Sequence, residues 1–123
     1  PEAPAQIKAD ILLVEDNLVN QKVAMAMLKK IGCQVWVAAN GALALKQIPE
    51  RKFDLIFMDC QMPIMDGFDA TRNIRSSSQD YANIPIIAVT ANALSSDRER
   101  CLQCGMNDYL SKPFQGLLNQ ISF

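Results

Sequence analysis

The chain alternates short apolar runs with segments whose apolar residues recur at helical spacing, and this alternation limits its folds more than any other feature. The apolar runs cover residues 11–14, 55–58 and 86–89, with shorter runs at 35–37 and 109–110. Strands that are apolar at every position are typical of parallel sheets, because helices cover both faces of such sheets. Five strands separated by helical segments therefore predict a doubly wound parallel α/β sheet with helices on both faces.

The segments between the runs carry helix signals. Apolar residues at 24, 27, 28 and 31 follow the i, i+3, i+4, i+7 spacing of an amphipathic helix, and Gly32 is a good stop for it. The polar stretch 76–83 predicts a loop. We expect further helices over 41–48, ended by Pro49, and over 68–75. Another helix should end at Gly105, and a last helix over 117–121 looks short.

Length and charge narrow the class of protein. The chain has 123 residues, of which 50% are hydrophobic and 20% charged, and this balance fits one globular domain. We expect a linker or tail over 1–9 and a single domain over 10–123. The net charge of −1 gives no general attraction to nucleic acid or to anionic lipid. No apolar run approaches the roughly 20 residues that span a bilayer, so we expect a cytoplasmic domain without direct membrane contact.

The chain contains four cysteines and no histidine. Cys101 and Cys104 form a C-x-x-C pair, a spacing that can bind zinc or exchange disulfides. A site with four ligands would also need Cys33 and Cys60, which are far away in sequence, so we expect buried thiols instead. The lack of histidine excludes Ser-His-Asp catalysis and autophosphorylation on histidine within this chain.

Polar side chains follow the predicted strands at the points where the strands end. Glu15 and Asp16 follow the first strand, Asp59 the third and Thr90 the fourth, and Lys112 lies beyond the fifth. Functional groups gather at the carboxyl ends of the strands in such sheets. Each residue alone has an ordinary interpretation, such as a helix N-cap for the acidic pair. Their joint occurrence at successive strand ends favours one functional site.

The chemistry of this set is that of phosphoryl transfer. Three neighbouring carboxylates repel one another, and a set of oxygen ligands suits a hard cation such as Mg²⁺, which would relieve the repulsion. An aspartate can then attack a phosphoryl group and form an acyl phosphate. Lys112 would supply a point charge for one phosphoryl oxygen, and the Thr90 hydroxyl a hydrogen bond to another.

Four segments carry a family resemblance, in the order and at the spacing of that family: LVEDN at 13–17, MDCQMPIMDG at 58–67, VTA at 89–91 and YLSKPF at 109–114. On these segments the chain resembles the receiver domains of two-component response regulators over residues 10 to 121. Asn17, Asn20 and Gln21, together with the M-P-x-M-D-G pattern, make it most similar to receivers of hybrid sensor histidine kinases.

This resemblance implies a flavodoxin-like fold with the strand order 2-1-3-4-5. It implies that Asp59 is the phosphoacceptor, and that Asp59, Asp16 and the backbone carbonyl of Gln61 ligate Mg²⁺ directly. Glu15 would act through metal-bound water. Lys112 would pair with Asp59, or with the phosphate once it is present.

The resemblance also implies a conformational switch and residues that set the lifetime of the phosphorylated state. Thr90 would move toward the phosphate while the Tyr109 ring rotates into the vacated space, which would remodel the surface around the fourth helix and fifth strand. Gln61 and Asn92 would border the path of the hydrolytic water. These two residues would therefore tune the lifetime of the phosphorylated state.

The implied function is that of a phosphoacceptor signalling domain in a two-component phosphorelay, with self-catalysed phosphoryl transfer and slow autodephosphorylation. Its implied partners are a histidine kinase domain, a histidine phosphotransfer domain or both, with no nucleic acid. The domain would be the non-kinase part of a hybrid histidine kinase, whose full-length form could be anchored in the inner membrane.

Two other functions stay open at this point. One is a receiver-like binding module that has lost phosphotransfer. The other is an Mg²⁺-dependent phosphatase of the dehalogenase-like class, which also uses an aspartate nucleophile after a strand. That class places a second aspartate two residues later, where this chain has Gln61, and it generally needs a longer chain with a cap.

Overall fold

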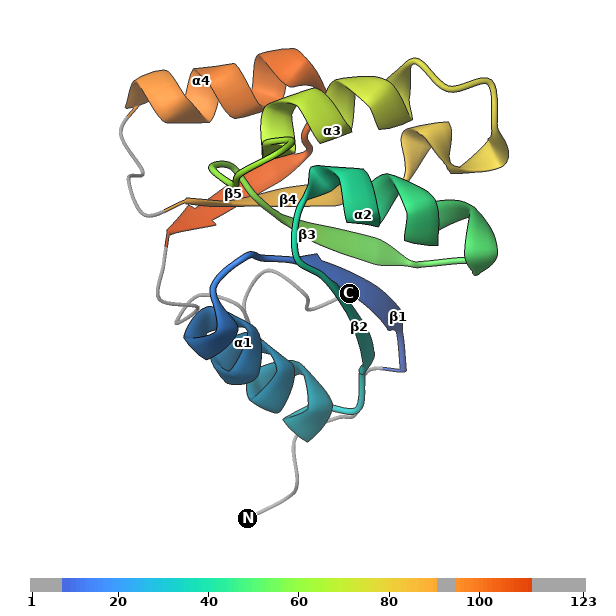
Figure 1. Ribbon diagram of the computed structural model, residues 1–123, viewed down its shortest axis with the longest axis vertical. Coiled ribbons are helices and arrows are strands. Elements are labelled where there is room, and N and C mark those ends of the chain that lie inside the picture. Colours follow the sequence, from blue (N-terminus) through green and yellow to red (C-terminus); the bar gives the residue numbers. More distant parts are fainter. Residues whose placement is uncertain (1–7, 91–94, 112–123) are drawn as a thin grey trace.

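The computed structural model describes residues 8–90 and 95–111 of the chain. Five strands form one parallel sheet in the order β2-β1-β3-β4-β5 (Figure 1). The predicted fold class and strand order are therefore confirmed. The strands are β1 Asp10–Val14, β2 Gln34–Ala38, β3 Leu55–Asp59, β4 Ile86–Thr90 and β5 Asp108–Ser111.

The described helices are α1 Leu18–Lys30, α2 Gly41–Gln47, η1 Ile48–Glu50, α3 Gly67–Arg75, η2 Asp80–Asn83 and α4 Ser95–Cys104, where η marks a 3₁₀ turn. α2 ends at Gln47, one residue before the predicted end, and Pro49 follows in the first turn of η1, where its missing N–H breaks no bond. One sequence prediction was wrong in detail. The polar stretch 76–83 is not all loop, since η2 occupies its second half. The predicted last helix lies outside the described residues.

The helices α1, α2 and α3 each follow a strand in the chain, and each has an N-cap side chain. Asn17, Asn40 and Asp66 each accept a hydrogen bond from the backbone N–H three residues later, at 2.9 or 3.0 Å. Such a cap contributes about 1 kcal/mol. These caps fix the first turns of three helices at the carboxyl edge of the sheet. Within the described residues, no helix is both long and apolar enough to cross a bilayer.

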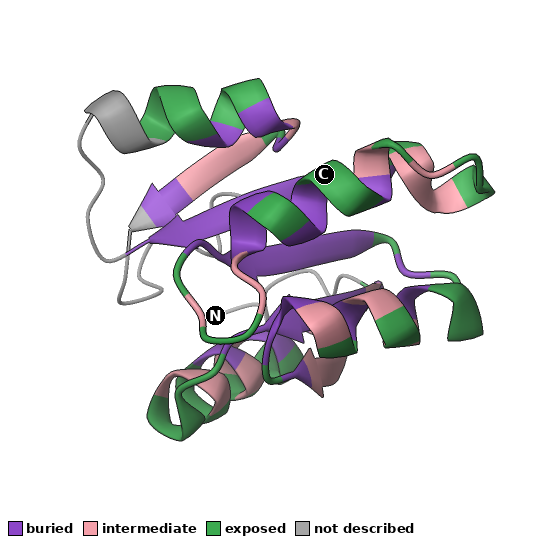
Figure 2. Cartoon of the chain, turned by 45° about the horizontal axis from the view of Figure 1, so that its top comes forward, coloured by how far each residue is buried: buried purple, intermediate pink, exposed green. Residues whose placement is uncertain are grey.

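Alternate strand residues pack into two cores, one on each face of the sheet. The α1 core contains Ala24 and Leu28 against Ile11 and Phe57. The α2–α4 core lies on the opposite face and includes the apolar side chains of those three helices. Every residue of β3 and β4 is buried, as the uniform colour of the central strands in Figure 2 shows. The continuous apolar runs in the sequence have this physical cause.

The four cysteines are buried thiols, as predicted, and the sheet separates Cys33 from the other three. Cys33 packs in the α1 core, whereas Cys60, Cys101 and Cys104 pack in the α2–α4 core. Cys60 is distant from the C-x-x-C pair in sequence, yet its Sγ lies 3.6 Å from that of Cys101. A site built from all four thiols cannot form, because Cys33 lies on the other side of the sheet.

Arg75, the last residue of α3, joins three segments at the amino edge of the sheet. Its Nε donates to the carbonyl of Gly105 at 2.8 Å, and its Nη1 donates to the carbonyls of Ala82 and Ile84 at 2.9 and 2.7 Å. Its Nη2 donates to Asn107 Oδ1 at 2.8 Å. Burial lowers the pKa of the guanidinium, which still remains charged at neutral pH. These bonds tie α3 to η2 and to the turn before β5.

Gly67, the first residue of α3, lies against the carboxyl end of β3. A Cβ atom at this position would lie 2.2 Å from the carbonyl oxygen of Asp59 and 2.9 Å from Met58 Cγ. The N–H of Gly67 donates to the carbonyl of Cys60 at 3.1 Å. Glycine is needed here because the backbone of α3 touches the backbone of β3.

We predict that Gly67→Ala lowers the free energy of unfolding by about 2 kcal/mol, because the added methyl group forces α3 away from β3. This loss outweighs the roughly 0.5–1 kcal/mol that alanine gains over glycine in a helix. Urea unfolding followed by circular dichroism measures the change. The control Asn73→Ala, on the exposed side of α3, should change stability by less than about 0.5 kcal/mol. Equal stability of the two variants would contradict the close contact.

We also predict that the native protein resists alkylation. Burial raises the pKa of the thiols of Cys33, Cys60 and Cys104, and for Cys60 the neighbouring Cys101 thiol adds to the effect. These groups therefore stay protonated at pH 8, and a protonated thiol is a poor nucleophile. Intact mass after iodoacetamide treatment should show unmodified native protein and complete modification in urea. Rapid reaction of one thiol in the native state would contradict the prediction, since it would show that reagent reaches the core around that thiol.

Candidate functional site

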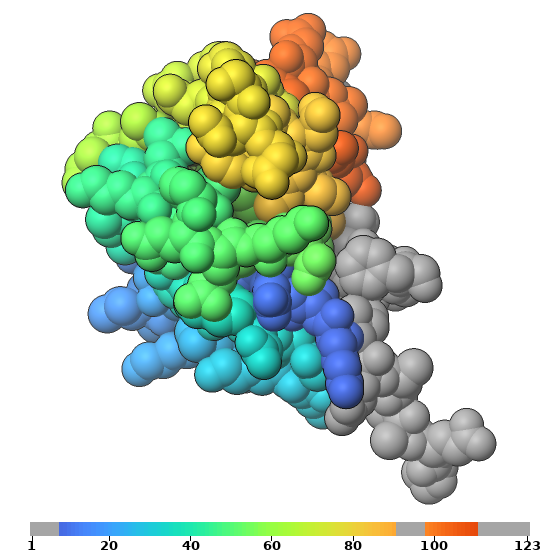
Figure 3. All heavy atoms as spheres, turned by 90° about the vertical axis from the view of Figure 1, so that its right-hand side faces the viewer, coloured from blue at the N-terminus to red at the C-terminus, as the bar shows by residue number. Residues whose placement is uncertain are grey.

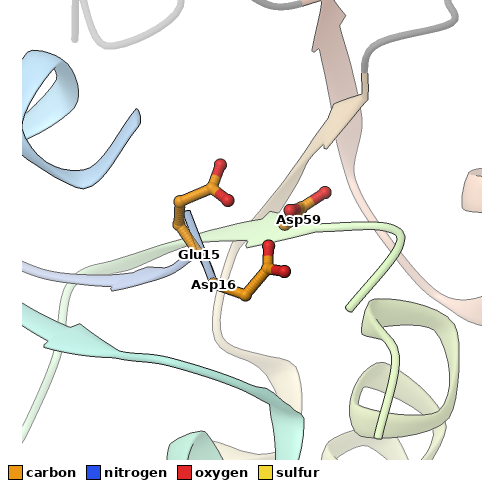
Figure 4. Close-up of side chains that lie close together, drawn as sticks. All are labelled: Glu15, Asp16 and Asp59. Atoms are coloured by element: carbon orange, nitrogen blue, oxygen red, sulfur yellow. The ribbon is translucent and has the colours of Figure 1, made fainter. Parts of the chain in front are cut away.

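Three acidic side chains meet at the carboxyl edge of the sheet (Figure 4). Glu15 and Asp16 follow β1 directly, and Asp59 is the last residue of β3. One carboxylate oxygen from each lies within 4.8 Å of the others. Glu15 and Asp59 are only 1% and 3% exposed, whereas Asp16 is exposed. The predicted convergence of these three carboxylates is confirmed.

Strand pairing brings the acidic residues together. In the β1–β3 ladder Val14 pairs with Met58, so the next residues along the two strands, Glu15 and Asp59, come side by side. The N–H of Glu15 also donates to the carbonyl of Ala38 on β2 at 3.0 Å, which extends the β1–β2 ladder by one residue. The position of Glu15 is therefore fixed by both neighbouring strands.

The first turn of α1 orients the acidic pair. Glu15 Oε2 accepts a hydrogen bond from the N–H of Asn17 at 3.0 Å. The carbonyl of Glu15 accepts one from Gln21 Nε2 at 2.7 Å. The sequence predicts Asn17 as a possible N-cap of this helix, which its hydrogen bond from the N–H of Asn20 confirms, whereas Gln21 stands out there only through the family resemblance. The hydrogen bonds of Asn17 and Gln21 to Glu15 fix the turn that carries both carboxylates.

Asp59 contacts the loop that follows it. Its Oδ1 accepts a hydrogen bond from the N–H of Gln61 at 3.3 Å. This contact holds the start of the β3–α3 loop next to the carboxylate, while the Gln61 side chain is exposed. The backbone of Gln61 thus lies beside the acidic cluster, where its carbonyl is predicted to be a metal ligand.

The remaining predicted residues divide into described and undescribed ones. Thr90 ends β4 and is 6% exposed, and the residue before it, Val89, pairs with Asp59. Tyr109 is half-buried on β5, and the guanidinium of Arg98 lies 5.4 Å from the centre of its ring. Thr90 and Tyr109 therefore lie on the two strands beyond Asp59. Lys112 and Asn92 lie outside the described residues.

The acidic cluster suits a hard divalent cation. The carboxylate oxygens lie within 4.8 Å of one another, so any two of these charges repel each other by at least about 3 kcal/mol at an effective dielectric constant of about 20. The donor atoms are carboxylate oxygens, which Mg²⁺ prefers, and the exposed side of Asp16 leaves room for the waters that Mg²⁺ retains. The residues present therefore fit the predicted metal.

A surface cavity of about 570 Å³ lies at the opposite, amino edge of the sheet. It is lined by the segments that precede β3 and β4, around η1 and η2, which are green and yellow in Figure 3. None of its lining residues belongs to the acidic cluster. The cavity therefore takes no part in this site.

Comparison with known sequences gives one consistent family. The sequence model of the response regulator receiver domain matches residues 11–120. The hybrid signal transduction histidine kinase K of Dictyostelium discoideum is 44% identical over 111 residues, which cover 85% of this chain and 9% of that protein. Histidine kinase 2 of Arabidopsis thaliana is 40% identical over 125 residues, which cover 85% of this chain and 11% of that protein. The chain therefore spans about a tenth of the length of these curated relatives.

Comparison with solved structures gives the same family. The receiver domain of the sensor histidine kinase PA1611 from Pseudomonas aeruginosa, with a magnesium ion coordinated in its active site cleft, is 50% identical with a TM-score of 0.82, over 93% of both chains. The receiver domain of the Arabidopsis thaliana histidine kinase CKI1, in complex with Mg²⁺, is 39% identical with a TM-score of 0.82, over 92% of this chain and 89% of that one. By its sequence, its strand order and its acidic edge, the chain belongs to the response regulator receiver domain family, with its relatives among the hybrid histidine kinases.

Proposed function

We propose that the chain is a phosphorelay receiver that takes a phosphoryl group from a phosphohistidine on another domain onto Asp59. The observation that carries this proposal is the set of three carboxylates within 4.8 Å at one sheet edge. The magnesium ions of two structural relatives support a cation at the same edge. Asp16, Asp59 and the Gln61 carbonyl would hold Mg²⁺ directly, and Glu15 would hold it through water. Bound Mg²⁺ neutralises charge on the phosphoryl oxygens.

The transfer is a substitution at phosphorus. A carboxylate oxygen of Asp59 forms a bond to phosphorus as the bond from phosphorus to the imidazole nitrogen breaks. The imidazole leaves with that electron pair, and it leaves neutral when its other nitrogen already carries a proton. The N–H of Gln61 orients the Asp59 carboxylate through Oδ1. In this proposal the Thr90 hydroxyl and the Lys112 ammonium each contact a phosphoryl oxygen of the product.

We further propose that the phosphodonor is a histidine kinase domain or a histidine phosphotransfer domain that docks on α1. Leu18, Val19 and Val23 are large apolar side chains that are 68%, 68% and 42% exposed. They begin two residues after Asp16, so a protein that brings a phosphohistidine to Asp59 meets them. Exposed apolar side chains beside a reaction site are typical of protein docking surfaces. We place the domain in the cytoplasm, where its four cysteine thiols stay reduced.

In the same proposal, Thr90 and Tyr109 form a conformational switch, and two further residues set the lifetime of the acyl phosphate. Thr90 ends β4 beside Asp59, and Tyr109 lies on the next strand, so a shift of the Thr90 hydroxyl toward phosphate would open space for the ring. Gln61 and Asn92 would border the path of the water that hydrolyses the acyl phosphate. The decay of the phosphorylated state in Gln61→Ala and Asn92→Ala measures this second role, and unchanged lifetimes would remove it.

We predict that phosphoramidate and Mg²⁺ add one phosphoryl group to the wild-type chain, as measured by intact mass. Addition should vanish in Asp59→Asn, which lacks the nucleophile, and on removal of Mg²⁺ with EDTA. The control Asp69→Asn, an exposed aspartate of α3, should be phosphorylated like the wild type. Fast release of phosphate without accumulation would favour a phosphatase, and no addition at all would favour a binding module.

We predict that Thr90→Ala breaks the switch while leaving Asp59 able to react. On phosphorylation of the wild type, the ring signal of Tyr109 should shift in the NMR spectrum of tyrosine-labelled protein. The shift should be lost in Thr90→Ala and kept in Thr90→Ser, which retains the hydroxyl. Tyr81, the other tyrosine of the chain, lies in η2 at the amino edge and serves as an internal control. A Tyr109 shift that persists in Thr90→Ala would end the coupling proposal.

A further inference from the structure

Ile64, in the loop between β3 and α3, has a backbone conformation that side chains of its type rarely adopt. Its φ is 71°, and among the described residues it is the one with a side chain beyond hydrogen and a positive φ. The N–H of Met65 donates to the carbonyl of Pro63 at 2.8 Å, which closes a γ-turn centred on Ile64. The γ-turn with positive φ is rare and strained, and a branched Cβ increases the strain.

The Ile64 side chain gains nothing from the protein's own core. It is 85% exposed, more than any other large apolar side chain among the described residues. Glycine or asparagine would adopt the same backbone at lower cost, and asparagine would also be better hydrated. Neither packing nor backbone preference explains an isoleucine at this position.

The rest of the loop holds the strained turn in place. Met62 and Met65 pack against the α2–α4 core. The carbonyl of Met65 accepts a hydrogen bond from the N–H of Gly41 at 3.0 Å, and Gly67 bonds back to Cys60. Both ends of the turn are therefore anchored, and such anchoring is what lets a strained residue persist. Because the backbone is already fixed, a partner that buries the side chain does not also have to order the loop.

We infer that Ile64 is a recognition residue for the protein phosphodonor, and that its side chain enters an apolar hollow beside the donor's phosphohistidine. This inference rests on the proposed function. The loop that carries Ile64 also carries Gln61, whose N–H contacts the Asp59 carboxylate. A protein docked over Asp59 therefore covers this loop. Burial of one isoleucine side chain changes affinity by about tenfold to a hundredfold. A small phosphodonor, in contrast, reaches Asp59 without touching Ile64.

The test compares two donors and four proteins. The protein donor is the kinase domain of the Pseudomonas aeruginosa sensor kinase whose receiver is 50% identical, phosphorylated on its histidine, and the small donor is phosphoramidate. Ile64→Asn should accept phosphate from the kinase domain about tenfold more slowly, and Ile64→Leu should stay close to the wild type. The control Leu102→Gln, which removes an exposed apolar side chain from α4, should not change either rate. Phosphoramidate should phosphorylate all four proteins equally.

The same variants test the strain. Ile64→Asn should raise Tm by about 3 °C, because asparagine tolerates the positive φ. The variant that docks worse should therefore be the more stable one. An unchanged Tm, an unchanged rate with the kinase domain, or a wild type that reacts no faster with that domain than with phosphoramidate would each overturn the inference. Loss of reaction with phosphoramidate in the wild type would instead refute the proposed function itself.

Discussion

The three carboxylates at the carboxyl edge of the sheet repel one another, and two of them are largely removed from water. The pairing of β1 with β3 makes this unavoidable, because the ladder that brings Val14 beside Met58 also brings Glu15 beside Asp59. Several features nearby offset the repulsion. The backbone N–H groups of Asn17 and Gln61 point at carboxylate oxygens, and the exposed Asp16 leaves the edge open to a cation.

Much of the fold follows from local physics in the sequence. The strands β3 and β4 are buried along their whole length, and their apolar runs are therefore easy to recognise. The order of the strands came from resemblance, because spacing within one strand says nothing about its neighbours. Pro49 indicates the end of α2 correctly to within two residues, but a proline also fits the first turn of a 3₁₀ segment, so the proline alone does not predict η1.

The candidate site was predictable where it depends on strand ends and unpredictable where it depends on loops. Glu15, Asp16 and Asp59 were found because a parallel sheet brings its carboxyl ends to one edge. The hydrogen bonds of Asn17 and Gln21 to Glu15 could not be derived, since polar side chains in a first helical turn have many possible partners. The positive φ of Ile64 was equally hidden, because a γ-turn leaves no mark in a sequence that places isoleucine there. Two unusual backbone features lie near Asp66: the close contact of Gly67 with β3 and the positive φ of Ile64. Such departures from local preference often occur at functional sites.

The four hydrogen bonds of Arg75 have a mechanical consequence for α4. They fix the C-terminal end of this helix, through Gly105 and Asn107, to α3 and η2 at the amino edge of the sheet. This attachment lies at the sheet edge opposite Asp59, and the middle of α4 is held as well, by Arg100 over the Phe68 ring of α3 and by Cys101 beside Cys60. Because Arg75 bonds to carbonyl and amide oxygens and not to an exposed carboxylate, added salt should weaken the attachment little.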